Sequence, residues 1–187
     1  MEKSDITVFT HPPRLICERI TLRRITREDL TDVYEYSRDP LLCKYLLWYP
    51  HPDIDYTAKY LNYVDKQYKK NLYYDFGIEY EGKMIGTCGF SSFDLDNDSG
   101  EIGYVLSRKF WGQGLAYEAV RRVMKFGFEE LRLNRIYARI MVGNEKSEDL
   151  AKKCGMRPEG LLKEAVKVKG EYRDIKIYAI TKKEYGG

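Results

Sequence analysis

The middle of the chain constrains the fold most, because it is patterned as three consecutive strands joined by short turns. Tyr73 to Tyr80 and Met84 to Phe93 have the composition of strands, and Glu81-Gly82-Lys83 between them is a typical hairpin turn. The polar cluster Asp94 to Gly100 predicts a second turn, and Glu101 to Leu106 predicts a third strand. The chain is therefore expected to build on an antiparallel meander.

Helical patterns lie on either side of this meander. Thr26 followed by Asp29 resembles a capping box that opens a helix through about Ser37, and apolar positions from Ile54 to about Asn71 fall at helical spacing. The remaining predicted elements are a strand over 15–24, a helix after Ala116, a strand over 135–142, a helix over 146–154 with Gly155 as its left-handed C′ residue, and a hairpin over 160–181. This order predicts one mixed α/β domain of the α+β type over residues 14–187, after an N-terminal extension over 1–13.

Composition excludes several classes of protein. The chain has 187 residues, 43% hydrophobic and 33% charged, which is typical of one globular domain. Its net charge of +3 comes from 32 basic and 29 acidic residues without a run of five like charges, so neither a nucleic-acid arm nor a membrane-binding patch is expected. Four separated cysteines and two histidines do not make a zinc site, and neither a signal peptide nor a membrane helix, which needs ~20 apolar residues, is expected. We expect a cytoplasmic protein without a metal.

The segment Trp111-Gly112-Gln113-Gly114-Leu115-Ala116 (residues 111–116) joins the third strand of the meander to a helix. Its two glycines allow the backbone to approach a ligand closely, and the first N–H groups of a helix have no acceptor within the helix. Together these features favour binding of a phosphate or pyrophosphate group. The same pattern also occurs in tight turns that bind nothing. It is neither a P-loop nor a dinucleotide fingerprint, because the required lysine and third glycine are absent.

The wider context resembles a known family. Glu101 to Leu106 (EIGYVL) followed by Trp111 to Ala119 (WGQGLAYEA) is similar to the pyrophosphate motif of the GNAT superfamily of N-acetyltransferases, and specifically to its RimJ/RimL-like branch. Asn144 to Met156 and the hairpin around Gly170 are similar to later elements of that branch. The resemblance implies a GNAT-like, mostly antiparallel sheet of about seven strands with helices on both faces. It also implies acetyl-CoA as co-substrate.

The resemblance further implies roles for individual residues. The strand ending at Leu106 is expected to diverge from the strand near Met141, with the pantetheine arm of acetyl-CoA in the gap. The residues expected to bind acetyl-CoA are Val105, Leu106, Trp111, Gly112, Gln113, Gly114, Leu115, Ala116, Asn144 and Ser147. Glu101 is the candidate general base, directly or through a water, and Ser147 the candidate proton donor to the thiolate. A tyrosine that often has the second role would align at Ala151.

Each of these roles has a structural alternative. Glu101 could be an exposed strand residue, Ser147 could cap the helix that follows it, and Asn144 could turn the chain out of its strand. Trp48, Tyr49 and His51 lie in an aromatic segment that lines the acceptor site in this family, but such a cluster is also typical of a core. His51 could serve as a second base.

The sequence therefore predicts an N-acetyltransferase that moves an acetyl group from acetyl-CoA to a primary amine by direct transfer in a ternary complex. The acceptor could be the N-terminal α-amine of a protein, or a small-molecule amine. A non-catalytic acyl-CoA-binding module is the alternative from another class. The exposed aromatic segment could pair two chains into a homodimer.

Overall fold

The computed structural model describes residues 5–186. Within them, eight strands form one sheet in the order β1-β2-β3-β4-β5-β6-β8-β7, and all neighbours are antiparallel except β5 and β6. The strands are β1 (Leu15–Ile16), β2 (Thr21–Arg23), β3 (Tyr74–Tyr80), β4 (Lys83–Asp94), β5 (Ser99–Leu106), β6 (Arg135–Met141), β7 (Arg157–Val168) and β8 (Glu171–Thr181). The predicted meander corresponds to β3, β4 and β5.

The helices cover the sheet from two sides. They are α1 (Leu30–Ser37), α2 (Ile54–Lys69), α3 (Leu115–Glu129), α4 (Glu145–Lys153) and α5 (Lys182–Tyr185), with short 3-10 helices η1 (Asp5–Thr10), η2 (Arg27–Asp29), η3 (Cys43–Tyr45) and η4 (Arg108–Phe110). The capping box of Thr26 and Asp29 is present, and Gly155 has a φ of +92° after α4, so both predictions are confirmed.

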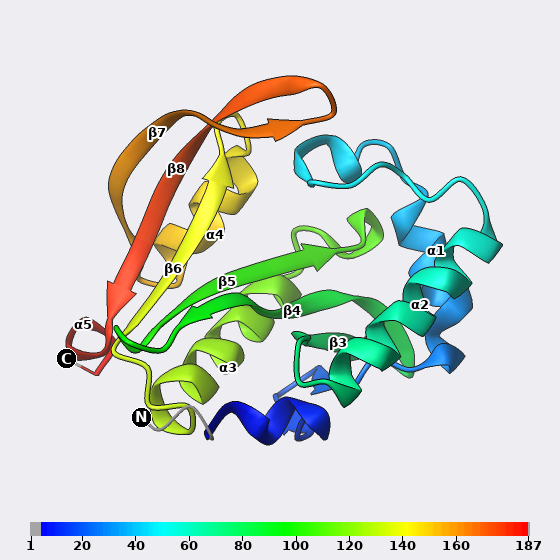
Figure 1. Cartoon of the computed structure of the whole chain (residues 1–187), viewed down its shortest axis with the longest axis horizontal. Coiled ribbons are helices and arrows are strands. Elements are labelled where there is room, and N and C mark those ends of the chain that lie inside the picture. Colours follow the sequence, from blue (N-terminus) through cyan, green and yellow to red (C-terminus); the bar gives the residue numbers. More distant parts are fainter. Residues whose placement is uncertain (1–4, 187) are drawn as a thin grey trace.

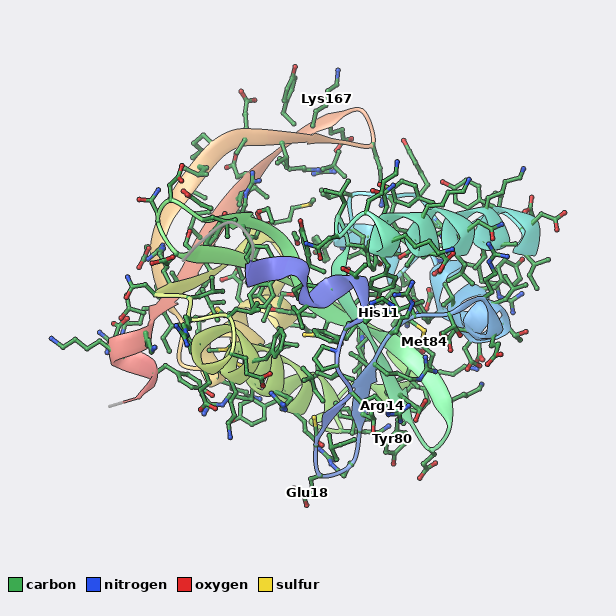
Figure 2. All side chains as sticks on the ribbon, turned by 60° about the horizontal axis from the view of Figure 1, so that its bottom comes forward. His11, Arg14, Glu18, Tyr80, Met84 and Lys167 are labelled. Carbon is green, nitrogen blue, oxygen red and sulfur yellow. The ribbon has the colours of Figure 1, made fainter. Side chains whose placement is uncertain are left out.

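The single strand predicted over residues 15–24 is wrong. The chain turns between β1 and β2, where the N–H of Cys17 donates to the carbonyl of Ile20 at 3.0 Å, so this segment supplies two short strands. That turn explains why the sheet has eight strands in the described residues rather than about seven. Figure 2 shows Glu18 at the tip of this turn and Lys167, on the β7–β8 hairpin, at the opposite end of the view.

Alternate residues of the central strands face two separate hydrophobic clusters. Phe76, Cys88 and Ile102 pack with α3 and α4 on one face, while Val105 and Met84 pack with α1 and α2 on the other. In Figure 1, α1 and α2 lie together past the tip of the β5 arrow, apart from α3 and α4. The same view shows β6 and β8 turning away from β5. The prediction of helices on both faces is therefore confirmed.

The described part of the predicted N-terminal extension packs on this sheet. Phe9 is fully buried, and its ring lies 5.6 Å from that of Phe76 and 5.9 Å from that of Phe126, between ring centroids. The segment around Phe9 therefore contributes to the core. Among the described residues, no helix has both the length and the apolar character needed to cross a membrane.

Candidate active site

Strands β5 and β6 pair only at their first three residues and then diverge. Ser99, Gly100 and Glu101 pair in parallel with Arg135, Ile136 and Tyr137. Beyond that point β5 continues with β4, and β6 continues with β8 as far as Met141. The divergence leaves a cavity of about 280 Å³ between the two strands, which we call the acetyl gap. The expected separation of Leu106 from Met141 is therefore present.

The loop at residues 111–116 has the conformation that its glycines allow. Gly112 and Gly114 have φ values of +77° and +80°, in the left-handed region, and α3 begins directly after Gly114. A Cβ at Gly112 would meet no atom within 4 Å, so the space outside the loop is open to a ligand. The unpaired N–H groups of the first turn of α3 adjoin this space, and the loop therefore fits a pyrophosphate group.

Two contacts of Trp111 hold this loop in place. The indole N–H of Trp111 donates to the carbonyl of Leu106 at 2.7 Å, and the ammonium nitrogen of Lys146 lies 4.1 Å from the centre of a Trp111 ring. The carbonyl of Leu106, expected from the sequence to bind the pantetheine arm, therefore already accepts a hydrogen bond from Trp111. Val105 remains exposed to the acetyl gap.

Arg19 connects this loop to the N-terminal part of the chain. The sequence analysis missed this contact. The guanidinium of Arg19 donates to the carbonyl of Gln113 at 2.8 Å and to a carboxylate oxygen of Glu118 at 2.9 Å. Glu118 also accepts from the backbone N–H groups of Arg19 and Ile20, at 2.7 and 3.3 Å. The turn between β1 and β2 is thus anchored on the first turn of α3.

Glu101 lies at the closed end of the acetyl gap, where β5 and β6 part. Its side chain is half-buried. Burial raises the pKa of Glu101, while the nearby Arg139 guanidinium and a hydrogen bond with Ser92 act in the opposite direction. The carboxylate is therefore not the exposed strand residue that was the alternative. It faces the cavity with a pKa displaced toward the range of a useful base.

The structure corrects the alternative reading of Ser147. Helix α4 begins at Glu145 with Asn144 as its N-cap residue, and the N–H of Ser147 donates to the carbonyl of Asn144 at 3.1 Å. Ser147 is therefore within the first turn and does not cap the helix. Asn144 and Ser147 both line the acetyl gap, and Ala151 is buried.

Tyr104 is a further hydroxyl on the same wall, and the sequence offered no reason to select it. Its hydroxyl donates to the backbone carbonyl of Ser147 at 3.1 Å. Burial raises the pKa of Tyr104 well above its ordinary value, so the phenol stays protonated at neutral pH. The gap therefore holds two hydroxyl groups near the start of α4.

A second cavity, of about 500 Å³, lies between the sheet and the helices α1 and α2. We call it the acceptor cavity. Trp48 lines both cavities, and His51 lines the acceptor cavity. The Nδ1 atom of His51 lies 2.8 Å from the hydroxyl oxygen of Thr57, and burial lowers the pKa of His51, so the imidazole is neutral near pH 7. Tyr49 is 65% exposed and lines neither cavity, so the structure does not bring it to the site with the other two residues.

Asp75 connects the two cavities and was missed in the sequence. It lines both of them, together with Trp48, Thr87 and Val105. Burial raises the pKa of Asp75 to about 7, although a hydrogen bond from Tyr73 partly offsets this effect. An aspartate within the aromatic run from Tyr73 to Phe76 was the available signal, because charged side chains are rare in a central strand.

The site thus combines a loop that fits a pyrophosphate group with two cavities that meet at shared residues. A family model described as an acetyltransferase (GNAT) domain matches residues 19–157. The chain belongs to the GNAT acetyltransferase family, as the sequence predicted, and is an acetyl-CoA-dependent N-acetyltransferase. No group of three or more potential metal-binding side chains occurs within residues 5–186.

Two curated relatives match over almost their whole length. The chain is 35% identical to "Uncharacterized N-acetyltransferase p20" of Bacillus licheniformis over 175 residues, which is 92% of this chain and 98% of the relative. It is 30% identical to "Putative ribosomal N-acetyltransferase YdaF" of Bacillus subtilis over 174 residues, covering 91% of this chain and 95% of the relative. The second relative supports the resemblance to the RimJ/RimL-like branch.

Solved structures have the same fold. A GNAT-family acetyltransferase from Bacillus anthracis superposes with a TM-score of 0.81 at 28% identity, covering 91% of this chain and 99% of that one. RimL, described as a ribosomal L7/L12 α-N-protein acetyltransferase in complex with coenzyme A, superposes with a TM-score of 0.79 at 21% identity, covering 90% and 98%. At that identity the second comparison speaks for the fold alone.

Proposed function

We propose that the protein transfers the acetyl group directly from acetyl-CoA to a primary amine, and that the N-terminal α-amine of a protein is its acceptor. The observation that supports direct transfer is the meeting of the acetyl gap and the acceptor cavity at shared residues, among them Asp75, Thr87 and Val105. An amine entering from one cavity reaches a thioester held in the other without an intermediate carrier. Because the chain belongs to an acetyltransferase family, a non-catalytic acyl-CoA-binding module is not proposed.

In this proposal acetyl-CoA supplies the activated thioester, and the chain binds it through the loop at residues 111–116, Val105 and Asn144. Glu101 takes a proton from the amine, directly or through a water, so that the nitrogen lone pair is free to attack. A backbone N–H of β5 stabilises the negative charge that develops on the carbonyl oxygen. The C–N bond forms, the C–S bond breaks, and Ser147 gives a proton to the leaving sulfur. The nitrogen then loses its second proton, which returns to Ser147 through water, and Glu101 releases the first proton to solvent.

A covalent relay through cysteine is not part of the proposal. Within residues 5–186, no cysteine lines either cavity. Burial raises the pKa of Cys17 and Cys43 to about 11 and that of Cys154 to about 12, and it raises the pKa of the fully buried Cys88 well above its ordinary value. A thiol with such a pKa is almost entirely protonated at pH 7 and is a poor nucleophile.

The choice of a protein α-amine rests on chemistry and on relatives. An α-amine has a pKa near 8, so about a tenth of it is neutral at pH 7, compared with far less of a lysine side chain near 10.4. The name of YdaF describes that relative as a putative ribosomal N-acetyltransferase, which favours a protein acceptor. A small-molecule amine is the second candidate, because the acceptor cavity of about 500 Å³ is large enough for one.

The test is release of free coenzyme A thiol from acetyl-CoA, measured with a panel of peptides and small amines. Transfer to peptide N-termini above the rate without acceptor supports the proposal. Transfer only to small amines would establish the second candidate instead. Mass spectrometry of enzyme quenched during turnover is expected to show no acetylated cysteine, and a kinetically competent acetyl-cysteine would overturn direct transfer.

Glu101→Gln tests the proposed base, because it keeps the size of the side chain and removes its basicity. General base catalysis contributes about 10²–10⁴-fold, so we expect kcat to fall within that range, most at low pH. Glu129→Gln, at an exposed residue that ends α3, is the matched control and is expected to retain full activity. A loss below threefold at every pH would remove Glu101 from the mechanism.

A further inference from the structure

The acceptor cavity has an aromatic wall and few charged groups. Its aromatic residues come from α1, α2 and the segment between them: Tyr36, Trp48, His51, Tyr56, Tyr60 and Tyr63. Among the described residues that line it, Asp75 is the only one with a carboxylate and Lys59 the only one with an ammonium group. Lys59 is exposed on α2, with the half-exposed Tyr56 and Tyr63 beside it, so this part of the lining forms the solvent side of the cavity.

Asp75 lies at the opposite, inner end of the cavity, and the strand register directs its carboxylate toward the acetyl gap. Asp75 pairs with Gly89 on β4, and Gly89 pairs in turn with Gly103 on β5. A Cβ at Gly89 would lie only 2.7 Å from a carboxylate oxygen of Asp75. The carboxylate therefore extends over Gly89, in the direction of β5. Gly103, one strand spacing of about 4.8 Å further on, has no side chain of its own, and the Ser91 hydroxyl lies beside it, 2.9 Å from where its Cβ would be.

No cation of the described chain neutralises Asp75. None of the ion pairs within residues 5–186 includes it, and its hydrogen-bond partner is the hydroxyl of Tyr73, which lies 2.8 Å from the hydroxyl of Tyr60. The other titratable groups on which the charge of Asp75 acts are the phenols of Tyr36, Tyr60 and Tyr68 and the thiol of Cys88, all of which burial keeps protonated. A carboxylate surrounded by neutral aromatic groups is stabilised by a bound cation.

We propose that Asp75 binds the ammonium group of the acceptor, and that the cavity selects a primary amine that carries a single positive charge on an aromatic or apolar body. This inference rests on the proposed function, because it names the group that receives the amine before Glu101 takes its proton. Aromatic faces attract the ammonium group and pack against the body of the acceptor. Lys59 repels a second positive charge at the solvent side.

Calorimetric titration of the CoA-saturated protein with 2-phenylethylamine tests this assignment. The matched probe is 4-(2-aminoethyl)benzylamine, which adds a second ammonium group to the same ring. We expect tighter binding of the monoamine. A hydrogen-bonded charge pair predicts that Asp75→Asn weakens monoamine binding by about 10- to 100-fold. The affinity for acetyl-CoA is expected to stay within twofold, which also reports that the variant folds.

Two further variants separate the roles of the residues. Glu101→Gln is expected to bind the monoamine normally but to turn over slowly, whereas Asp75→Asn is expected to raise KM for the amine more than it lowers kcat. Lys59→Gln, an exposed change without risk to folding, is expected to improve diamine binding by up to about fivefold. Preference for the diamine, failure of both amines to bind, or normal monoamine binding by Asp75→Asn would each overturn the assignment. Binding of the monoamine without acetyl transfer to any amine would contradict the proposed function alone.

Discussion

The carboxylate of Asp75 is expected to make the stability of the protein depend on pH in an unusual direction. Burial raises the pKa of Asp75 to about 7 in the folded chain, against an ordinary value of 3.8. Below pH 4 the side chain is protonated in the folded and unfolded states alike. Between pH 4 and 7 the unfolded chain loses this proton while the folded chain keeps it, so the free energy of unfolding falls as pH rises.

The size of the effect follows from the difference between the two pKa values. That difference corresponds to at most about 4 kcal/mol above pH 7, since a tenfold change in proton affinity is about 1.4 kcal/mol. The cavity leaves the carboxylate within reach of water, so we expect about 2–3 kcal/mol, of which at least 1 kcal/mol develops between pH 5 and pH 8. Asp75→Asn keeps the size of the side chain and cannot ionise, and it therefore removes this cost.

Urea unfolding of the wild type and Asp75→Asn at pH 5 and pH 8 measures the effect directly. All other titrating groups are common to both proteins and cancel in the comparison. We expect the free energy of unfolding of Asp75→Asn, relative to that of the wild type, to be at least 1 kcal/mol larger at pH 8 than at pH 5. An equal difference at the two pH values, within about 0.5 kcal/mol, would refute the reasoning, because it would mean that folding does not raise the pKa of Asp75 above about 5.

Three other substitutions test the rest of the site. Gly114→Val places a β-branched residue at a φ of +80°, with its Cβ 3.3 Å from the Arg19 guanidinium, and calorimetry is expected to show at least a tenfold loss of acetyl-CoA affinity. Ser147→Ala is expected to change the free energy of unfolding by less than about 0.5 kcal/mol, because Ser147 is not a cap, while kcat falls; unchanged kcat would exclude it as proton donor. Glu118→Gln weakens the charged hydrogen bonds to the β1–β2 turn and is expected to cost about 1–3 kcal/mol in urea unfolding; no cost would mean that the contact is not stabilising.

Local signals in the sequence predicted much of the fold. The capping box at Thr26, the hairpin turn at Glu81 to Lys83 and the glycines at 112 and 114 each depend on a few neighbouring residues, and each is present in the structure. The turn inside residues 15–24 was missed, because its anchor is Glu118 on a helix about 100 residues later. No local pattern reports a contact of that kind.

Asp75 was missed for a different reason. A central strand with helices on both faces has no polar side, so alternation does not tell which way a residue points. The direction of Asp75 depends on its pairing with Gly89. Its unpaired charge depends on helices α1 and α2, which place aromatic residues around it and Lys59 at the solvent side of the cavity. The surroundings of Asp75 depend on how four elements are arranged in space. The loop at residues 111–116 depends only on the local connection between one strand and one helix.

The arrangement also bears on how the product leaves. An acceptor held by Asp75 enters as an ammonium ion and leaves as an amide, which carries no charge. The ion pair that binds the acceptor is therefore lost in the same step that forms the product, while the aromatic contacts of the acceptor cavity remain. Weak binding of the acetylated amine follows from this loss of charge, and the ionised carboxylate is then free to bind the next ammonium group. The ionised carboxylate of Asp75 lowers the stability of the fold. The same negative charge lets Asp75 bind the charged acceptor and release the uncharged product.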